Sequence, residues 1–325
     1  MGKSPSEWDL FMRPVRIATR GSDLALVQAR YVASRIQNEL DLDTELVVIT
    51  TTGDRIQDRS LAKIGGKGLF IKEIEQSLLE DRADVAVHSA KDLPSEIAEG
   101  LSLSAFPERA DPRDALVGRT QAETLETLTP GARIGTGSTR RAAQLLALRP
   151  DLEIVPLRGN VPTRLRKIET EGLEAVVLAS AGLDRLGLSD VISQRIEPEI
   201  MLPAVCQGLL ALQTRQGEAF SERISELDDD ENADQAAAER AFLRQLGGDC
   251  TIPLAAHCES SGADRLTIRG CLANSDGTTL LHSEAQGGRA EASDLGKRVA
   301  DEILASGGSA LLRELRAGAA GEVRS

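Results

Sequence analysis

The stretch VRIATRGSDLALVQARYVASRIQNELDLDTELVVITT, residues 15–51, decides the fold. It opens with a short apolar run at residues 15–19, and residues 24–40 then repeat apolar side chains at helical spacing. Residues 45–51 form a β-branched run that is typical of a strand. A strand, a helix and a second strand in this order form the unit of a parallel sheet. The sequence therefore predicts an α/β lobe that starts here.

The alternation continues and then starts again after a turn-rich segment, PERADPRD, at residues 107–114. This restart predicts a second α/β lobe, again with a parallel sheet. A strand at residues 209–214 follows the second lobe, and we expect it to cross back to the first. The other expected elements are helices at residues 69–79, 138–148 and 161–171 and strands at residues 84–88, 133–137, 153–157 and 175–180.

A charge run, LDDDENAD at residues 227–234, is interpreted as a linker to a small third domain. Beyond it we expect an α+β arrangement, with helices at residues 235–246 and 295–305 and strands at residues 265–273 and 278–286. The predicted fold class is α/β, with two lobes around a cleft at the strand carboxyl ends and a small α+β domain. The expected domains are residues 12–108 with 209–226, residues 109–208, and residues 227–325.

Composition excludes several classes of function. The chain has 325 residues, with 38 Lys and Arg against 51 Asp and Glu, so its formal charge is −13. A strongly negative chain binds nucleic acid or an anionic membrane poorly, because like charges repel, although a local basic cleft remains possible. Aromatic residues make up only 2%, which argues against a surface that stacks bases. We therefore expect no nucleic-acid partner.

Histidines and cysteines give no metal-binding pattern. The three histidines, His88, His257 and His282, are far apart, and no C-x-x-C occurs. We therefore expect no metal site and no disulfide framework, and we place the chain in a reducing compartment. No apolar run approaches the ~18 residues of a membrane helix, and the first residues lack a secretory signal. The expected location is the cytoplasm, without membrane attachment.

Several arginines follow predicted strands directly. Ser138 can cap a helix whose first turn carries Arg140 and Arg141. A helix N-terminus with guanidinium groups binds anions, although a solvated helix start is an equally common outcome for an isolated Arg pair. Other residues, mostly arginines, also directly follow predicted strands and should lie at the same ends of the sheets. Because guanidinium groups pair with carboxylates, we expect a ligand with several carboxylates. These residues are Arg20, Ser22, Arg158, Arg164 and Arg185.

The segment HSAKDLP, residues 88–94, brings Lys91 and Asp92 to the edge of this basic cleft. Asp92 can be a turn residue before a proline. A carboxylate beside bound polyanions instead makes chemical sense if positive charge develops during a reaction. His88 is interpreted as a packed strand residue. GGKG at residues 65–68 fails the phosphate-loop pattern and is interpreted as part of a mobile loop at residues 54–68.

Quoted in chain order, seven segments resemble the porphobilinogen deaminase family, from about Arg16 to the C-terminus. They are IATRGSDLAL (17–26), LAKIGGKGLF (61–70), HSAKDLP (88–94), DPRDA (111–115), LRGNVPTRL (157–165), LASAGLDRLGL (178–188) and LPAVCQGLL (202–210). The resemblance implies two lobes like those of periplasmic binding proteins, and a third domain that carries a cofactor cysteine. It also implies a transferase that joins four porphobilinogen molecules head to tail into hydroxymethylbilane, with release of ammonia.

The resemblance assigns roles to individual residues. Cys250, in GGDCTIP, matches the cysteine that holds a dipyrromethane cofactor by a thioether, and Asp92 matches the catalytic aspartate. Further positions match the binding of the cofactor (Lys91, Asp92, Ser138, Arg140, Arg141, Arg164), the binding of substrate (Arg20, Ser22, Arg158, Arg185), and the loop over the cleft (Lys63, Lys67). Each pyrrole carries an acetate and a propionate, which suits the arginines. Loss of ammonia leaves an electron-poor azafulvene, which Asp92 can stabilise.

Three positions depart from the family pattern. Asp249 stands before the cofactor cysteine where glycine is usual, and a carboxylate there would raise the pKa of the thiol. Gly137 replaces an expected serine, and Cys206 replaces a glycine. Two rival functions remain open: an anion-binding receptor on the same fold, and an inactive relative kept as an interaction protein. The resemblance also implies a monomer that hands its product to uroporphyrinogen-III synthase.

Overall fold

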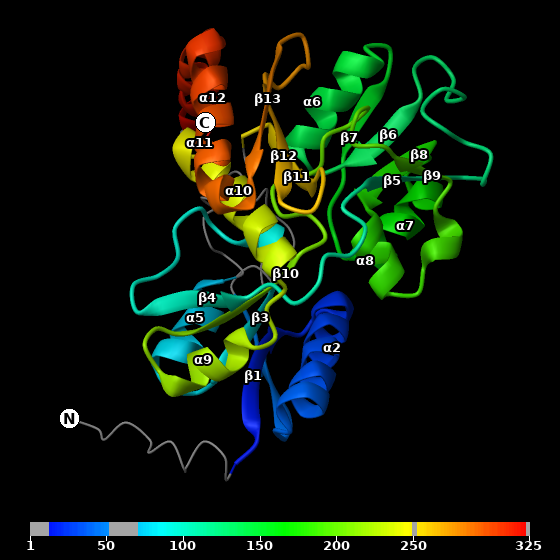
Figure 1. Ribbon diagram of the computed structural model, residues 1–325. Coiled ribbons are helices and arrows are strands. Elements are labelled where there is room, and N and C mark those ends of the chain that lie inside the picture. Colours follow the sequence, from blue (N-terminus) through cyan, green and yellow to red (C-terminus); the bar gives the residue numbers. More distant parts are fainter. Residues whose placement is uncertain (1–12, 52–70, 249–251, 323–325) are drawn as a thin grey trace. The chain divides into compact units, whose positions relative to one another are not determined.

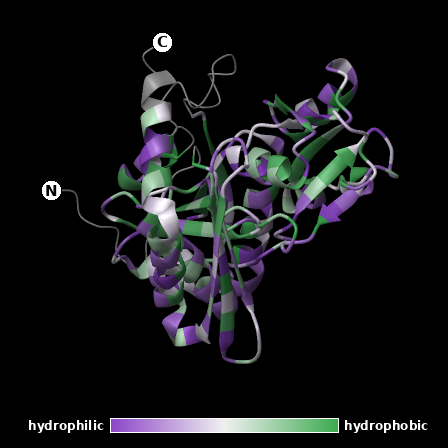
Figure 2. Ribbon diagram, turned by 90° about the horizontal axis from the view of Figure 1, so that it is seen from above, coloured by the Kyte–Doolittle hydropathy of each residue, from purple (hydrophilic) through white to green (hydrophobic). Residues whose placement is uncertain are grey.

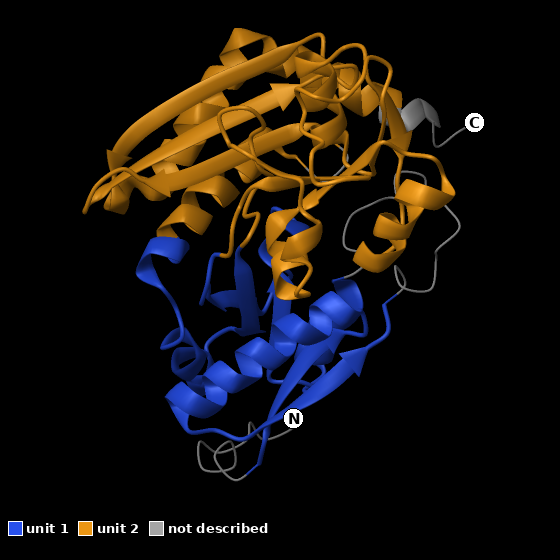
Figure 3. Cartoon of the chain, turned by 90° about the vertical axis from the view of Figure 1, so that its right-hand side faces the viewer, with its two compact units in different colours: residues 1–57, 68–109, 209–233 blue, residues 58–67, 110–208, 234–325 orange. Residues whose placement is uncertain are grey.

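The computed structural model describes residues 13–51, 71–248 and 252–322, and it divides into two compact units. The first unit contains the described residues up to 109 and returns for residues 209–233, whereas the second contains residues 110–208 and the described residues from 234 onward (Figure 3). The expected mobile loop at 54–68, with Lys63 and Lys67, lies outside the described residues. Cys250 and Asp249 lie outside them as well.

The first unit is built on a five-stranded sheet in the order β2-β1-β3-β10-β4. Strand β1 (Val15–Arg20) pairs in parallel with β2 (Thr44–Ile49) and β3 (Val85–Ser89), as the sequence predicts. Strand β10 (Leu210–Arg215) runs antiparallel to both β3 and β4 (Leu101–Ala105), so the sheet is mixed. The sequence predicted neither β4 nor the direction of β10. The chain re-enters this sheet beside the carboxyl end of β3, where Leu210 pairs with Ser89, and it must therefore run in the opposite direction.

Helices cover both faces of this sheet. Consecutive residues of β1 point to opposite faces, as strand geometry requires. Ile17 packs in a cluster with Val32 of α2 (Asp23–Leu40), whereas Ala18 packs in another cluster with Ile74 of α5 (Lys72–Leu79). A third helix, α9 (Ala219–Ser225), adds Phe220 and Ile224 to the cluster of α2. Figure 1 shows α2 and α5 on either side of the strands.

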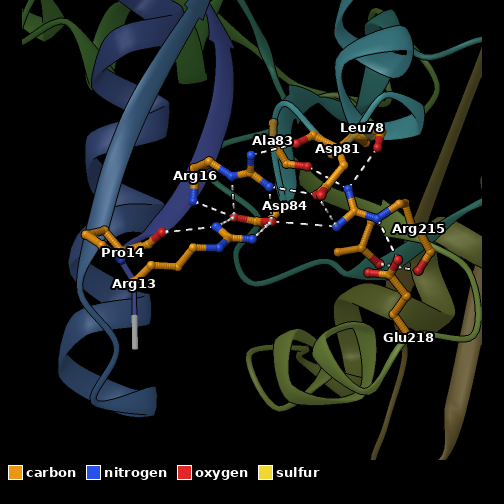
Figure 4. A network of polar contacts seen from close by, with 10 residues as sticks. Arg13, Pro14, Arg16, Leu78, Asp81, Ala83, Asp84, Arg215 and Glu218 are labelled. Carbon is orange, nitrogen blue, oxygen red and sulfur yellow. Dashed lines mark hydrogen bonds and ion pairs between the residues drawn. The ribbon is translucent and has the colours of Figure 1, made fainter. Parts of the chain in front are cut away.

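An ion-pair network lies at the end of this sheet where β1 and β3 begin (Figure 4). Asp84, 1% exposed, accepts hydrogen bonds from Arg13 (2.7 and 2.9 Å) and from the backbone and guanidinium of Arg16 (2.8–3.1 Å). Arg16 also pairs with Asp81, which Arg215 approaches at 3.3 Å. Burial alone would raise the pKa of Asp84, but the hydrogen bonds from Arg13 and Arg16 outweigh it and hold that pKa well below its usual range.

Replacing Asp84 by Asn should lower the free energy of unfolding by about 2–3 kcal/mol, because two guanidiniums lose their buried carboxylate. The native pKa is depressed, so the wild-type advantage is present above the unfolded pKa of about 4 and shrinks as the pH falls below it. Urea unfolding between pH 3 and pH 7 measures both effects. The matched control is Glu80→Gln, which breaks the exposed pair with Arg82 and should change little. Equal losses in both variants would contradict the special role of Asp84.

The second unit begins with another five-stranded sheet, in the order β7-β6-β8-β5-β9. Strand β6 (Arg133–Thr136) is parallel to β7 (Glu153–Pro156) and β8 (Ala175–Ala179). Strand β5 (Asp114–Gly118) is antiparallel to β8 and β9 (Gln194–Ile196), and neither β5 nor β9 was predicted. The following helices are α6 (Thr139–Leu148), α7 (Val161–Thr170) and α8 (Ser180–Arg185).

A three-stranded antiparallel sheet completes the second unit, in the order β11-β12-β13. Helix α10 begins at Asp230, inside the charge run, so the interpretation of that whole run as a linker was wrong. Acidic residues suit the first turn of a helix because they face its positive end. The elements here are β11 (Leu254–Ser260), β12 (Arg265–Ala273), β13 (Leu280–Gly288), α10 (Asp230–Leu246), α11 (Ala292–Ile303) and α12 (Ser309–Glu322). The boundary of a separate third domain at residue 227 stays a prediction.

Hydropathy follows the architecture. The buried strands are mostly hydrophobic, whereas helices carry hydrophobic and hydrophilic residues side by side (Figure 2).

Short turns of helix occupy Ala90–Asp92, Ser189–Val191, Arg289–Glu291 and Leu304–Gly308. Within the described ranges, no helix combines the length and the apolar character that crossing a membrane requires.

Candidate functional site

Asp92 lies just past the carboxyl end of β3 in the first unit. The strand ends at Ser89, and a single 3₁₀ turn spans Ala90–Asp92. The N–H of Ala90 donates to the carbonyl of Leu209 (3.0 Å), and Leu93 is buried, so the backbone on both sides of Asp92 is fixed. The Asp92 side chain itself is exposed. The geometry therefore offers one carboxylate on a firm backbone at the edge of the sheet.

His88, four residues earlier, is a packed strand residue, as predicted. It is 6% exposed, and its Nε2 lies 2.9 Å from Oε1 of Gln213, whose amide nitrogen donates to Glu75 (2.8 Å). Because Gln213 donates to the carboxylate, its oxygen faces His88, and the imidazole must carry its proton on Nε2. Burial lowers the pKa of His88 to about 4, against the smaller effect of the Gln213 hydrogen bond. His88 is therefore a neutral support of β3 at neutral pH.

Arg20 and Ser22 occupy the corresponding position after β1. Arg20 is the last residue of β1, and the Ser22 hydroxyl caps α2 by accepting from the N–H of Ala25 (3.4 Å). Strands β1 and β3 are parallel neighbours, so Arg20 reaches the same sheet edge as Lys91 and Asp92. The structure thus brings together, within the first unit, all four predicted site residues that lie in its described part.

In the second unit, the predicted arginines follow the carboxyl ends of three parallel strands. Helix α6 begins after β6 and is capped by Ser138, which accepts from the N–H of Arg141 (3.4 Å). Arg158 lies between β7 and α7, and Arg164 in α7 donates to the carbonyl of Gly159 (2.7 Å). Arg185 ends α8 and donates to the carbonyl of Gly208 (2.9 Å). Parallel pairing therefore collects these residues at one edge.

Arg140 and Arg141 are buried and share one carboxylate, that of Asp114. Arg140 donates to Asp114 from Nη1 (2.7 Å) and Nη2 (3.2 Å), and Arg141 donates from Nε (2.9 Å) and Nη2 (2.7 Å). Asp114, which is fully buried, opens β5 and pairs in register with Ala179 at the carboxyl end of β8. The arginines therefore meet Asp114 at the same sheet edge.

The charges of this cluster do not cancel. Burial alone would raise the pKa of Asp114, but the positive charges of Arg140 and Arg141 outweigh it, so Asp114 stays ionised. Burial lowers the pKa of Arg141, and the attraction of Asp114 opposes that shift. An arginine stays protonated at neutral pH even so, because its unperturbed pKa is so high. Two cations and one anion leave one positive charge, which suits a carboxylate ligand.

Gly137, at a position where the family resemblance implies serine, lies close to another backbone segment. A Cβ atom at this position would come within 2.4 Å of the carbonyl oxygen of Leu157, just before Arg158. Any side chain would therefore push the β7–α7 turn away from α6. The departure from the family pattern thus has a steric reason in this chain.

Gly137→Ser should lower the free energy of unfolding by about 1–3 kcal/mol, because the backbone at Leu157 must move. Gly21→Ser is the matched control. Gly21 also precedes a helix cap, but its added Cβ would meet only Val48 at an ordinary 3.4 Å. Urea unfolding of both variants measures the difference. If Gly137→Ser has the same free energy of unfolding as the wild type, the β7–α7 turn can move without cost and the steric explanation is wrong.

The three described cysteines are buried, as expected for core residues. Burial raises the pKa of the Cys271 thiol to about 12, which makes it a poor nucleophile at neutral pH. Cys206 takes a left-handed conformation (φ 59°), and its N–H donates to the buried carboxylate of Glu239. A glycine would adopt this conformation without strain, which explains why Cys206 is unusual here. Among the described residues no group of three His, Cys, Asp or Glu side chains could hold a metal ion.

Sequence reasoning assigned no role to two residues of the arginine edge, Asp114 and Gln207. The amide nitrogen of Gln207 donates to Asp114 (2.9 Å) and to the carbonyl of Pro112 (2.7 Å). The sequence held one signal for Asp114. It is an acidic residue at the start of the apolar run DALVG, and a carboxylate buried with such a run needs a positively charged or hydrogen-bonding partner. No sequence signal distinguishes Gln207.

Comparison with known proteins gives matches along nearly the whole chain. The family description "Porphobilinogen deaminase, dipyromethane cofactor binding domain" matches residues 15–223, and "Porphobilinogen deaminase, C-terminal domain" matches residues 233–305. A porphobilinogen deaminase of Syntrophus aciditrophicus is 50% identical over 306 residues, or 94% of this chain and 99% of that protein. One from Trichlorobacter lovleyi is 46% identical over 303 residues, or 93% and 96%.

Solved structures with similar folds are more distant. A periplasmic substrate-binding protein of an ABC transporter from Coxiella burnetii has a TM-score of 0.42 and 12% identity, over 70% of this chain and 96% of that one. The VFT2 domain of BvgS from Bordetella pertussis has a TM-score of 0.40 and 18% identity, over 66% and 85%.

Proposed function

Because the chain belongs to the porphobilinogen deaminase family, we propose that its two units divide one reaction between them. The enzyme is a transferase that condenses four porphobilinogen molecules head to tail into hydroxymethylbilane and releases ammonia, in tetrapyrrole biosynthesis. The first unit supplies the catalytic carboxylate, Asp92, and the second supplies the arginines that hold carboxylates. The observation that carries this division is the position of each set at the carboxyl edge of its own parallel strands.

The arginine edge fits the dipyrromethane group that this family carries. A group with several carboxylates needs several cations, and the second unit presents five arginines that follow β6, β7 and β8. The uncancelled charge of the Arg140–Arg141–Asp114 cluster favours such an anion. When bound, the dipyrromethane supplies the chain end to which substrate is added. The residues proposed to hold it are Lys91, Asp92, Ser138, Arg140, Arg141, Arg164 and, through a thioether, Cys250.

Asp92 is proposed to act on the porphobilinogen that is losing ammonia. Its exposed carboxylate can accept a hydrogen bond from the pyrrole N–H and stabilise the positive charge that develops there. The same carboxylate can assist proton transfer. Its fixed backbone avoids the reorganisation that a mobile loop would require at the moment of reaction.

Four residues are proposed to orient the substrate through its acetate and propionate groups. Guanidinium groups bind carboxylates with paired hydrogen bonds, so each arginine fixes direction as well as position. Lys63 and Lys67 are proposed to belong to the loop that covers the bound chain. The four substrate residues are Arg20, Ser22, Arg158 and Arg185.

The proposal includes the setting of the reaction. The chain acts as a monomer in the cytoplasm, where reducing conditions keep the Cys250 thiol available for attachment. Its product passes to uroporphyrinogen-III synthase, which takes the linear tetrapyrrole as substrate.

Asp92→Asn should lower kcat for porphobilinogen by about 100-fold or more, because an amide cannot balance the positive charge. The structure should be unchanged, since the Asp92 side chain is exposed. Steady-state kinetics with a circular-dichroism check of folding tests this. The control is Glu99→Gln, which removes another exposed carboxylate a few residues along and should retain wild-type kcat. Near-normal turnover in Asp92→Asn would remove Asp92 from its proposed role.

Intact-mass spectrometry of acid-denatured protein should show the chain plus a two-pyrrole adduct, because a thioether survives denaturation and a non-covalent ligand does not. Peptide mapping should place the adduct on Cys250 and not on Cys206, Cys258 or Cys271. Cys250→Ser should lose the adduct and the activity together. Fully active protein with an unmodified Cys250 would contradict covalent attachment and favour a different priming mechanism.

A further inference from the structure

Asp114 is a heavily hydrogen-bonded side chain of the arginine edge. Its carboxylate accepts five hydrogen bonds, all between 2.7 and 3.2 Å, from Arg140, Arg141 and Gln207. Four of the five converge on Oδ1, and only Nη1 of Arg140 binds Oδ2. A carboxylate with this many donors holds each partner in a single orientation.

Each guanidinium is also fixed on its far side. Nη1 of Arg140 donates to the carbonyl of Leu202 (2.8 Å), and Nη1 of Arg141 donates to the carbonyl of Val177 (3.1 Å). Among the described residues, Nε of Arg140 has no hydrogen-bond acceptor. Arg140 and Arg141 are 5% and 6% exposed, and neither can swing out to find a ligand elsewhere.

The buried charges of this cluster are unbalanced. Burying two guanidiniums against one carboxylate costs more free energy than burying a balanced pair, because the second charge loses water without gaining a counter-ion. In the part of the chain that the structure describes, Asp114 is the only carboxylate paired with either arginine. The uncancelled positive charge therefore suits an external carboxylate.

We propose that Asp114, itself held by Gln207, is a positioning residue that fixes the direction and net charge of the Arg140–Arg141 pair for a carboxylate of the pyrrole chain. This inference rests on the proposed function. Asp114 does not touch the ligand. It cancels one of the two charges, so the pair binds a single carboxylate, and it orients the remaining N–H donors toward it.

Gln207 connects this cluster to the segment that precedes β10. The amide of Gln207 is 1% exposed and bridges Asp114 and the carbonyl of Pro112. The preceding N–H, that of Cys206, donates to Glu239 of α10. Glu239 also accepts from the N–H of Cys258 in β11 (2.8 Å). The Asp114 carboxylate is thus fixed by a chain of buried hydrogen bonds that continues into the three-stranded part of the same unit.

Asp114→Asn is the main test. The amide oxygen can replace Oδ1, but the amide nitrogen would then face Nη1 of Arg140, and two donors repel each other. Arg140 should lose its orientation while Arg141 keeps most of its contacts. The expected result is a changed distribution of pyrrole-chain lengths on the protein after brief incubation with porphobilinogen, with one length enriched about threefold or more in intact-mass spectrometry, because a chain whose carboxylate is not held in place stalls at that length.

A merely structural role gives the opposite pattern. Partial unfolding lowers the active fraction, but it leaves the distribution of chain lengths on the active protein unchanged. Wild-type turnover is measured first. If the wild type does not consume porphobilinogen, the proposed function fails, and this inference with it. If the wild type is active and Asp114→Asn has an unchanged distribution of chain lengths, the inference alone is overturned.

Gln207→Leu keeps the test decisive if Asp114→Asn does not fold. It removes one hydrogen bond from Asp114 and should enrich the same chain length by about twofold. The matched control is Gln28→Leu. Gln28 is also buried, at 5% exposed, and donates to the hydroxyl of Ser89 (2.9 Å) in the first unit. Gln28→Leu should lose stability with an unchanged distribution of chain lengths. Equal distributions in the two glutamine variants would overturn the proposal.

Discussion

Parallel pairing of three strands in each unit is the constraint on which the rest of the structure depends. A parallel connection must cross the sheet and return, so each strand is followed by a helix that starts at the same edge. In the first unit this edge collects Arg20 and Asp92, and in the second it collects the arginines after β6, β7 and β8. Residues that are remote in sequence become neighbours through strand direction alone.

Charge balance distinguishes the two buried arginine clusters of this protein. The network around Asp84 in the first unit joins three arginines to three acidic residues, so its charges cancel and it needs no ligand. The cluster around Asp114 joins two arginines to one carboxylate and remains positive. The same residue types thus form a balanced network at one end of a sheet, and at an end of the other sheet a positive cluster that we propose binds a carboxylate. The residues of the balanced network are Arg13, Arg16, Arg215, Asp81, Asp84 and Glu218.

Periodicity predicted the parallel strands and their helices well, because each buries a face with a regular repeat. It missed β4, β5 and β9, which are short and draw their stability from neighbours rather than from a pattern of their own. It also missed the longer β11, which is paired only on one side, with β12. The antiparallel direction of β10 was also missed, because direction depends on where the chain re-enters the sheet. The positions of the arginines followed from strand ends, whereas the partner of Arg140 and Arg141 did not. Asp114 lies 26 residues before Arg140, and only the fold reveals that they touch.

The return of β10 to the first unit has a consequence for how the chain is made. On the ribosome, β1 to β4 emerge long before their fifth strand, and β4 joins the sheet only through β10. At about 5–20 residues per second, synthesis of the intervening hundred or so residues takes on the order of 10 s. During that interval the nascent first unit has an open edge at β3, where Leu210–Gln213 will later pair. The second lobe's arginine edge is therefore translated in full before the unit that bears Asp92 can close.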